Sequence, residues 1–310
     1  MKGLFPATGI GFSWRFSWRG VPKTLKGILL ILISVSCFAT MDATIRRLSG
    51  ELHPFEIAFF RNFFGSLALM PLLLREGLGS LRTKRLGLFA LRGVLNTIAM
   101  LMFFWALSRV PLAEVTALSF TIPLFASLFA IWLLRERVYL QRWVALGLGF
   151  VGMVVVLRPG FQAVTLGSAA ALAASVLLAW VTVLIKILSR TESSITITAY
   201  MGLFQAPLSL LAAVWFWQWP ALQDWIPLVA IGCLGTLGQV LMIHAFAYAD
   251  VSTLLPFQFS ALIWATLYGF FWFGEWPDLW TWVGGAIIFG SSLALAYRES
   301  RLKASSAPSQ

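Results

Sequence analysis

The feature that most constrains this chain is a series of long apolar runs, each about 20 residues and able to cross a bilayer as a helix. Ten such runs occur, at about 28–48, 55–74, 86–107, 111–134, 140–158, 167–188, 194–216, 226–248, 251–273 and 279–297. Only 11% of the residues are charged, against roughly 25% in soluble domains. The sequence therefore predicts an all-α integral membrane protein with ten transmembrane helices.

The second half of the chain repeats the outline of the first. Shifted by 139 residues, Glu136 falls on Glu275 and Trp143 on Trp282 without a gap. Each copy holds five apolar runs, and because five is odd, the second copy is upside down in the membrane. Inverted repeats are the build of many secondary transporters, with the substrate site near the midplane between the halves.

The repeat also divides the chain into domains. We predict two inverted five-helix repeats at 27–159 and 160–298, with a basic, aromatic tail at 1–26 and a second tail at 299–310. Of the 23 Lys and Arg residues, 17 fall on the side of the termini, 4 on the other side and 2 inside spans. This bias predicts a multi-pass protein of a bacterial inner membrane with both termini in the cytoplasm.

The composition argues against several other classes of protein. The net charge of +11 sits mostly at the ends of apolar runs, so it indicates membrane orientation rather than nucleic-acid binding. No metal-ligand or nucleotide-binding motif occurs, and no cofactor is predicted. A membrane enzyme would need a cluster of acids or metal ligands at the membrane face, and no such cluster is visible in the sequence. The expected partners are a small-molecule substrate and the lipid bilayer, while proton coupling and a homodimer stay open.

Several local features match a known family in addition to this outline. They are Ala106–Glu114, Pro123 inside the fourth run, Leu134–Arg137 after it, Phe273–Glu275 and Gly284–Gly285. The chain thereby resembles EamA-type members of the drug/metabolite transporter superfamily. It departs from the pattern at Asp250, where the first repeat has Pro111, and it has no second proline matching Pro123.

The resemblance implies secondary transport by alternating access, without naming the substrate. Similar proteins move amino acids, nucleotide-like metabolites, vitamins or metallophores. We expect a small polar or amphipathic metabolite that carries a carboxylate, with export slightly favoured. The alternative is an importer or passive facilitator of a metabolite such as S-adenosylmethionine or riboflavin.

Ionisable groups inside spans are the first candidates for the site, because they are costly in hydrocarbon. Asp42 and Arg61 lie at similar depths toward the outer side, and Glu114 begins the fourth span from that side. We expect the three to meet as a charged cluster that captures substrate or couples protons. A purely structural ion pair is the competing interpretation. Arg92 and Asn96 lie one helical turn apart and could grip a carboxylate or phosphate; snorkelling of Arg92 is the alternative.

The second half adds polar and aromatic candidates. Gln258, Trp264 and Tyr268 are predicted to contact substrate, because aromatic rings with a few polar groups suit an amphipathic ligand. Packing is the competing explanation for the two rings. His244 joins Asp42 and Glu114 as a candidate for proton coupling. The sequence also predicts hinges at Pro123 and Pro256, where a span loses a backbone hydrogen bond.

Overall fold

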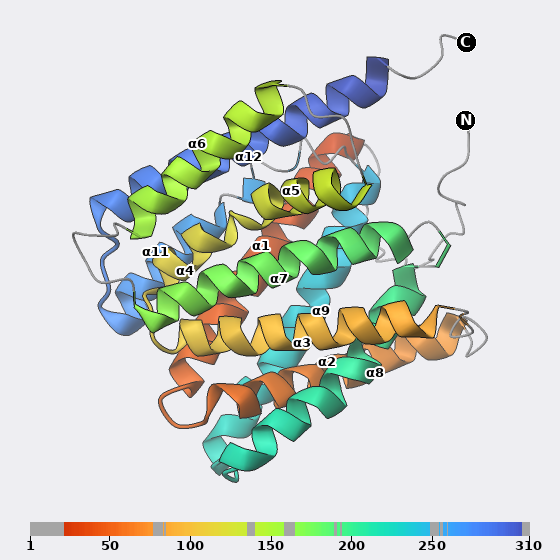
Figure 1. Ribbon diagram of the computed structural model, residues 1–310. Helices are drawn as coiled ribbons and strands as arrows, with labels where there is room; N and C mark the ends of the chain where they lie inside the picture. The colour runs from red at the N-terminus through yellow and green to blue at the C-terminus, as the bar shows by residue number, and fades with distance from the viewer. Residues whose placement is uncertain are drawn as a thin grey trace.

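The structure is a computed structural model, which describes residues 22–76, 83, 85–134, 140–157, 165–188, 191–192, 194–248, 254, 257–258 and 260–305. This part of the chain is all-helical (Figure 1). The first half holds α1 (Lys23–Leu48), α2 (Pro54–Glu76), α3 (Leu86–Leu107), α4 (Leu112–Ser119), α5 (Ile122–Leu134) and α6 (Leu140–Leu157). The second half holds α7 (Leu166–Leu188), α8 (Ser194–Ala213), α9 (Trp225–Tyr248), α11 (Ser260–Phe273) and α12 (Leu279–Ser305), with short 3-10 turns at Val214–Phe216 and Leu222–Asp224.

The apolar runs of the sequence correspond closely to these helices, and several suit a membrane. Within the described residues, five helical stretches are long and apolar enough to cross a bilayer: Lys23–Leu48, Leu86–Leu107, Leu166–Ile185, Thr196–Phe216 and Leu222–Phe246. Large apolar side chains are exposed on the outside of the bundle, among them Leu166 at 79% and Phe271 at 74%. Such a surface is stable against lipid and unfavourable in water.

The fourth expected span differs from the prediction, because it is divided into α4 and α5. The N–H groups of Phe120 and Thr121 donate three residues back, to the carbonyls of Ala117 and Leu118 at 3.2 and 3.0 Å. These bonds tighten the last turn of α4 and end it. Pro123 follows at the start of α5, where its missing N–H does no harm. The break therefore lies directly before the predicted hinge residue.

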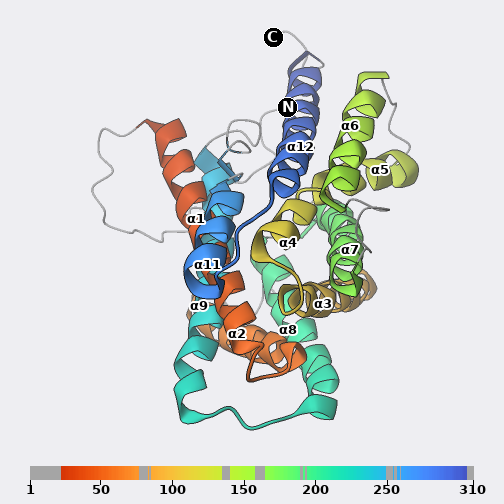
Figure 2. The ribbon, with the colours of Figure 1, turned by 90° about the vertical axis from the view of Figure 1, so that its left-hand side faces the viewer.

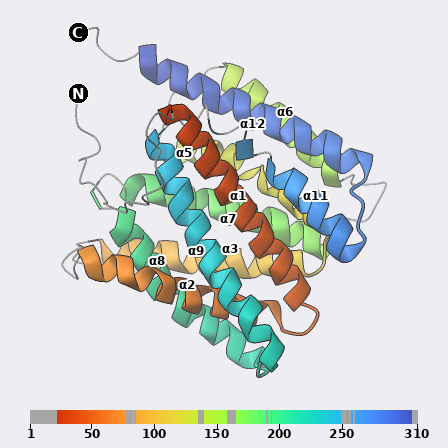
Figure 3. The same ribbon diagram turned by 180° about the vertical axis from the view of Figure 1, so that it is seen from behind.

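The most extensive helix contacts join the two halves of the chain. In Figures 1 and 3, α1 runs beside α9, and α6 runs beside α12. The helix α3 packs against α7, α2 against α8 and α9, and α4 against α11 (Figure 2). The halves are thus interlocked rather than placed side by side. Any site inside the bundle is built from both.

Close packing of α6 on α12 depends on two facing glycines. A Cβ on Gly152 would lie 2.9 Å from the Gly284 carbonyl oxygen, and one on Gly284 would lie 2.7 Å from that of Gly152. Side chains at either position would therefore push the helices apart. Small residues commonly allow such close approach of helices in membranes.

Candidate functional site

An internal pair of opposite charges lies where α1 passes α2. Asp42 on α1 and Arg61 on α2 are both half-buried and interact electrostatically. Asp42 Oδ1 is buried without a hydrogen-bond partner, and the ion pair found among the described residues lies elsewhere. The two groups thus interact without forming an ion pair by direct contact.

Space for the Arg61 side chain comes from a glycine on α9. A Cβ on Gly235 would lie 3.1 Å from Arg61 Nε and 3.2 Å from Nη2, and 2.9 Å from Met41 Sδ. The guanidinium therefore lies across the bare backbone of α9. It also donates from Nη1 to Asn62 Oδ1 at 3.1 Å. Helices from both halves consequently fix the position of Arg61.

An aromatic stripe on α11 lies beside the same part of α1. Trp264 and Tyr268 stack with ring centroids 6.1 Å apart, and Tyr268 contacts Trp272 at 5.0 Å. The Tyr268 hydroxyl shares a 2.7 Å hydrogen bond with Thr40 Oγ1, two residues before Asp42. The predicted aromatic residues are therefore neighbours, and one of them is tied directly to α1.

The predicted three-residue cluster forms only in part. Asp42 and Arg61 come together, but Glu114 is bound to α7: its Oε1 accepts a 2.7 Å hydrogen bond from Ser168 Oγ. Ser168 is 3% exposed. Glu114 thus links α4 to α7, a contact that the sequence did not indicate. His244 is half-buried on α9.

Arg92 is buried at 5% exposure and points toward α8 rather than toward the headgroups. Its Nη1 donates to the Ile197 carbonyl at 3.0 Å, while Nε is buried without a partner. Asn96 is half-buried and makes no hydrogen bond through its side chain within the described chain. Nη1 of Arg92 is therefore engaged by backbone, and the grip of Arg92 and Asn96 on a carboxylate or phosphate stays a prediction.

The structure describes the remaining predicted residues only in part. Gln258 is half-buried in a short helical stretch before α11. Pro256 lies outside the described residues. Gly93 on α3, one residue from Arg92, lies against the side chain of Phe204 on α8, so the α3–α8 contact near Arg92 is tight.

A second arginine–carboxylate pair joins the two halves at one end of the bundle. Arg46, in the last turn of α1, forms an ion pair with Glu275 and donates to the carbonyl of Val110. It also donates to the Leu107 carbonyl at 3.3 Å, and its guanidinium lies 5.0 Å from the centre of the Phe273 ring. We call this set of contacts the Arg46 clasp.

The end of α11 aims Glu275 at the clasp. Gly274 has a φ of 64°, a left-handed conformation that glycine adopts without strain. The Gly274 N–H donates to Phe270 and the Glu275 N–H donates to Gly269, at 3.1 and 2.9 Å. The bond from the left-handed Gly274 to Phe270, four residues back, closes the helix as an αL motif. The sequence did not indicate the clasp, although Glu275 is the repeat partner of Glu136 and Arg46 lies near the end of an apolar run.

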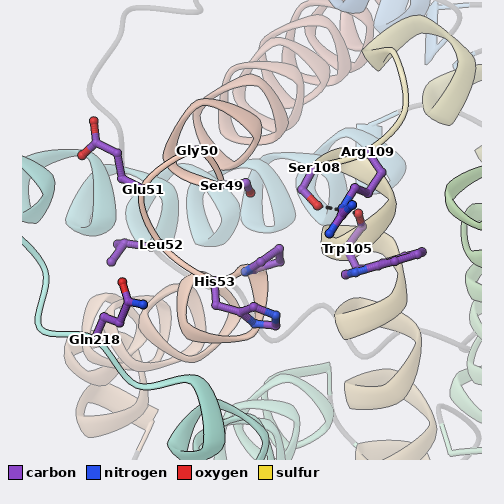
Figure 4. Close-up of a pocket in the computed structure, with 10 residues that line it drawn as sticks. Ser49, Gly50, Glu51, Leu52, His53, Trp105, Ser108, Arg109 and Gln218 are labelled. Carbon is purple, nitrogen blue, oxygen red and sulfur yellow. Dashed lines mark hydrogen bonds between the residues drawn. The ribbon is translucent and has the colours of Figure 1, made fainter.

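A cavity of about 440 Å³ opens at the same end, over the turn between α1 and α2. Figure 4 shows His53 and Leu52 on one side of it and Trp105, Ser108 and Arg109 on the other. The His53 ring stacks on Phe216 at 3.9 Å, and its Nδ1 accepts from the Phe55 N–H at 3.3 Å. Burial and the charge of Arg109 lower the pKa of His53 from its usual 6.5.

Comparison with known proteins defines the class. The model of the EamA-like transporter family matches residues 25–158 and again residues 165–297. The chain belongs to this family, within the drug/metabolite transporter superfamily. It is a multi-pass membrane transporter of small metabolites and not an enzyme. Among the described residues, no group of three His, Cys, Asp or Glu side chains could hold a metal ion.

Several relatives with named substrates extend this result. The S-adenosylmethionine uptake transporter of Rickettsia bellii is 32% identical over 275 residues, covering 89% of this chain and 94% of that protein. The riboflavin transporter of Vibrio cholerae is 33% identical, covering 85% and 90%. The pseudopaline exporter of Pseudomonas aeruginosa is 28% identical, covering 87% and 96%.

One solved crystal structure has the same fold. It superposes with a TM-score of 0.60 and covers 91% of this chain and 98% of the other. At 21% identity, the likeness concerns the fold alone. The function of this chain therefore rests on its family and on the chemistry inside the bundle.

Proposed function

We propose that this transporter imports a small metabolite with an amino-acid group, of the S-adenosylmethionine class, by alternating access. The observation that carries the proposal is the Asp42–Arg61 pair, whose charges interact without an ion-pair contact and whose Asp42 Oδ1 has no hydrogen-bond partner in the described chain. A free amino acid group carries one charge of each sign, so it matches such a pair.

The roles of the two residues follow from their donors and acceptors. Arg61 offers five N–H donors, of which Nη1 is bonded to Asn62, and the guanidinium suits a carboxylate. Asp42 accepts from the substrate ammonium through its unpaired oxygen. Each charge is then neutralised by substrate instead of remaining uncompensated in low dielectric.

Aromatic residues supply the complementary surface for the rest of the metabolite. Trp264 and Tyr268 present stacked rings next to α1, and rings of this kind suit a purine-like portion. Gln258, which precedes α11, adds an amide. Arg92 and Asn96 lie at the α3–α8 contact, where Arg92 contributes to binding only if it releases the Ile197 carbonyl.

The transport cycle uses two inverted five-helix repeats, 27–159 and 160–298, with ten spans between cytoplasmic tails in the inner membrane. Two observations support this: the family model matches twice, and α1–α9 packing is mirrored by α3–α7 packing, as a two-fold axis in the membrane requires. The Arg46 clasp closes the end that the charge bias places outside. Breaking it admits substrate from that side, with Pro123 and Pro256 as hinges.

Proton coupling is part of the proposal. Asp42 is the first candidate because its oxygen is unpaired, followed by His244 and by Glu114, which is held by Ser168. A proton that binds Asp42 would have to leave before the substrate ammonium can be bound. Uptake driven by an imposed pH gradient, and lost in Asp42→Asn, would support this step, whereas unchanged pH dependence in Asp42→Asn and Glu114→Gln together would exclude it.

The test is uptake of radiolabelled S-adenosylmethionine by cells that express the protein, compared with vector-only cells. We expect accumulation above the external concentration, competed by unlabelled compound and not by riboflavin. Accumulation of riboflavin alone would favour the other class of relative. Equilibration without accumulation would indicate a facilitator, and faster loss from preloaded cells without uptake would indicate an exporter.

A further inference from the structure

Asn62 occupies an unusual place between the charged pair and the second half of the chain. It follows Arg61 on α2 and is 2% exposed. Its Oδ1 accepts from Arg61 Nη1 at 3.1 Å, and its Nδ2 donates to Ser209 Oγ on α8 at 3.2 Å. Both arms of one amide are therefore used, one in each half of the protein.

The orientation of this amide is fixed by its neighbours. A guanidinium has only donors, so the atom that faces Arg61 must be the oxygen. The NH2 group must then face α8, where Ser209 Oγ and the Gln205 carbonyl oxygen, 3.5 Å away, accept from it. Ser209 Oγ itself donates to the Gln205 carbonyl at 2.6 Å, which leaves its lone pairs available to Asn62.

A buried amide is costly in a membrane unless it is fully bonded. An apolar residue of similar size would hold α2 against α8 without that cost. The bond to Arg61 is what an apolar residue could not supply. It occupies Nη1 of Arg61, while Nε and Nη2 lie against Gly235 of α9, and it makes the direction of the guanidinium depend on the position of α8.

We propose that Asn62 is a positioning residue for Arg61, coupling the direction of the guanidinium to the position of α8. The inference rests on the proposed function, in which Arg61 binds the carboxylate of an amino-acid-bearing substrate. When α8 moves against α2 during transport, the amide turns with Ser209 and draws Oδ1 away from Nη1. Arg61 then reorients, and its grip on the carboxylate differs between the two states.

The test compares Asn62→Leu, which removes both arms, with Ser209→Ala, which removes one of the two α8 acceptors, keeps the Gln205 carbonyl and leaves the Arg61 bond available. For S-adenosylmethionine uptake we expect Asn62→Leu to raise KM about tenfold, the loss expected for a hydrogen bond to a charged group. Ser209→Ala should change KM by less than about twofold. For decarboxylated S-adenosylmethionine, which lacks the carboxylate that Arg61 binds, the KM should change little in either variant.

A role limited to helix packing predicts something else. Both variants would then lower the amount of folded protein to a similar extent, and the KM for each substrate would not change. Equal KM values in wild type and Asn62→Leu, or an equal rise for both substrates, would overturn the proposal.

A second measurement does not depend on the substrate. Phenylglyoxal modification of Arg61, quantified by mass spectrometry on the purified protein, should be several-fold faster in Asn62→Leu than in wild type or Ser209→Ala. An unchanged rate would overturn the positioning role by itself. If the wild type takes up no S-adenosylmethionine but Arg61 is modified faster in Asn62→Leu, the substrate assignment is refuted. The positioning role of Asn62 is then retained.

Discussion

The two arginine–carboxylate pairs of this protein differ in how completely they are satisfied. In the Arg46 clasp, the charges touch, and the guanidinium also binds two backbone carbonyls and an aromatic face. In the Asp42–Arg61 pair, the charges do not touch, and one carboxylate oxygen is buried without a partner. Although Glu275 Oε2 also has no hydrogen-bond partner in the described chain, the clasp's charges are in contact, and such a pair can hold two helices together. A pair whose charges stay apart in the interior has capacity for a ligand.

The largest expected effect is loss of the internal pair. Asp42→Asn or Arg61→Gln should reduce uptake of S-adenosylmethionine about 10–100-fold, since each removes a charge-assisted bond worth about 1.5–3 kcal/mol. Initial uptake rates, normalised to the amount of protein in the membrane, measure this. Glu51→Gln is the matched control, because Glu51 is exposed in the turn after α1 and has no part in the proposed site. Equal losses in all three variants would mean that the internal pair has no special role.

Neutralising the clasp should act in the opposite direction on affinity. Glu275→Gln weakens the closure of the outer end, so more molecules are open to external substrate, and the apparent affinity rises with that fraction. We expect KM for uptake to fall about fivefold and the maximal rate to fall as well. Uptake rates over a range of substrate concentrations test this, with the exposed Glu51→Gln as control. A raised KM would show that Glu275 binds substrate instead of closing the outer end.

A smaller effect is expected when Arg61 is crowded rather than removed. In Gly235→Ala the new methyl group would lie about 3 Å from Met41 Sδ and the Arg61 guanidinium, closer than ordinary contacts allow, so Arg61 must shift. Uptake should fall about threefold while the protein still folds. Gly290→Ala, where nothing lies within 4 Å of the added carbon, should leave uptake unchanged. Wild-type uptake by Gly235→Ala would show that the position of Arg61 is not critical.

The smallest expected effect is a pH dependence of stability caused by His53, in the turn between α1 and α2. Because the pKa of His53 is lowered in the folded protein by burial and by Arg109, the unfolded chain binds the proton more readily. Stability that is present above pH 6.5 is therefore lost as the pH falls. We expect the thermal midpoint in detergent to drop by about 1–3 °C more in wild type than in His53→Gln between pH 7.5 and 5.5. Identical drops would exclude His53 as the cause.

The sequence predicted the helices well because hydrocarbon thickness dictates the length of an apolar run. The start of α1 at Lys23 was missed, since lysines before the run look like a loop. The break after α4 was also missed, although Pro123 marked its position, because a break depends on where backbone N–H groups find partners. The interlocking of α1 with α9 was not foreseen either, since it is a property of packing between distant segments.

The site was predictable where a charge stands alone in an apolar run, as Asp42 and Arg61 do. It was not predictable where a charge lies near the end of a run, because Arg46 there looks like an orientation signal. Asn62 was overlooked as a neutral neighbour of Arg61, and its importance depends on Ser209, 147 residues away. Glu114 shows the converse case, since a charge at a plausible depth is bonded to a different helix.

The most direct test of the central claim is competition for S-adenosylmethionine uptake in proteoliposomes that contain the purified protein. The account predicts that S-adenosylhomocysteine, which keeps the amino-acid group, competes strongly. Methylthioadenosine, which keeps the purine and loses that group, should compete at least about tenfold more weakly. This difference between the two compounds should vanish in the Arg61→Gln variant, measured on its residual uptake. Equal competition by the two compounds in wild type would contradict the claim that Asp42 and Arg61 recognise an amino acid.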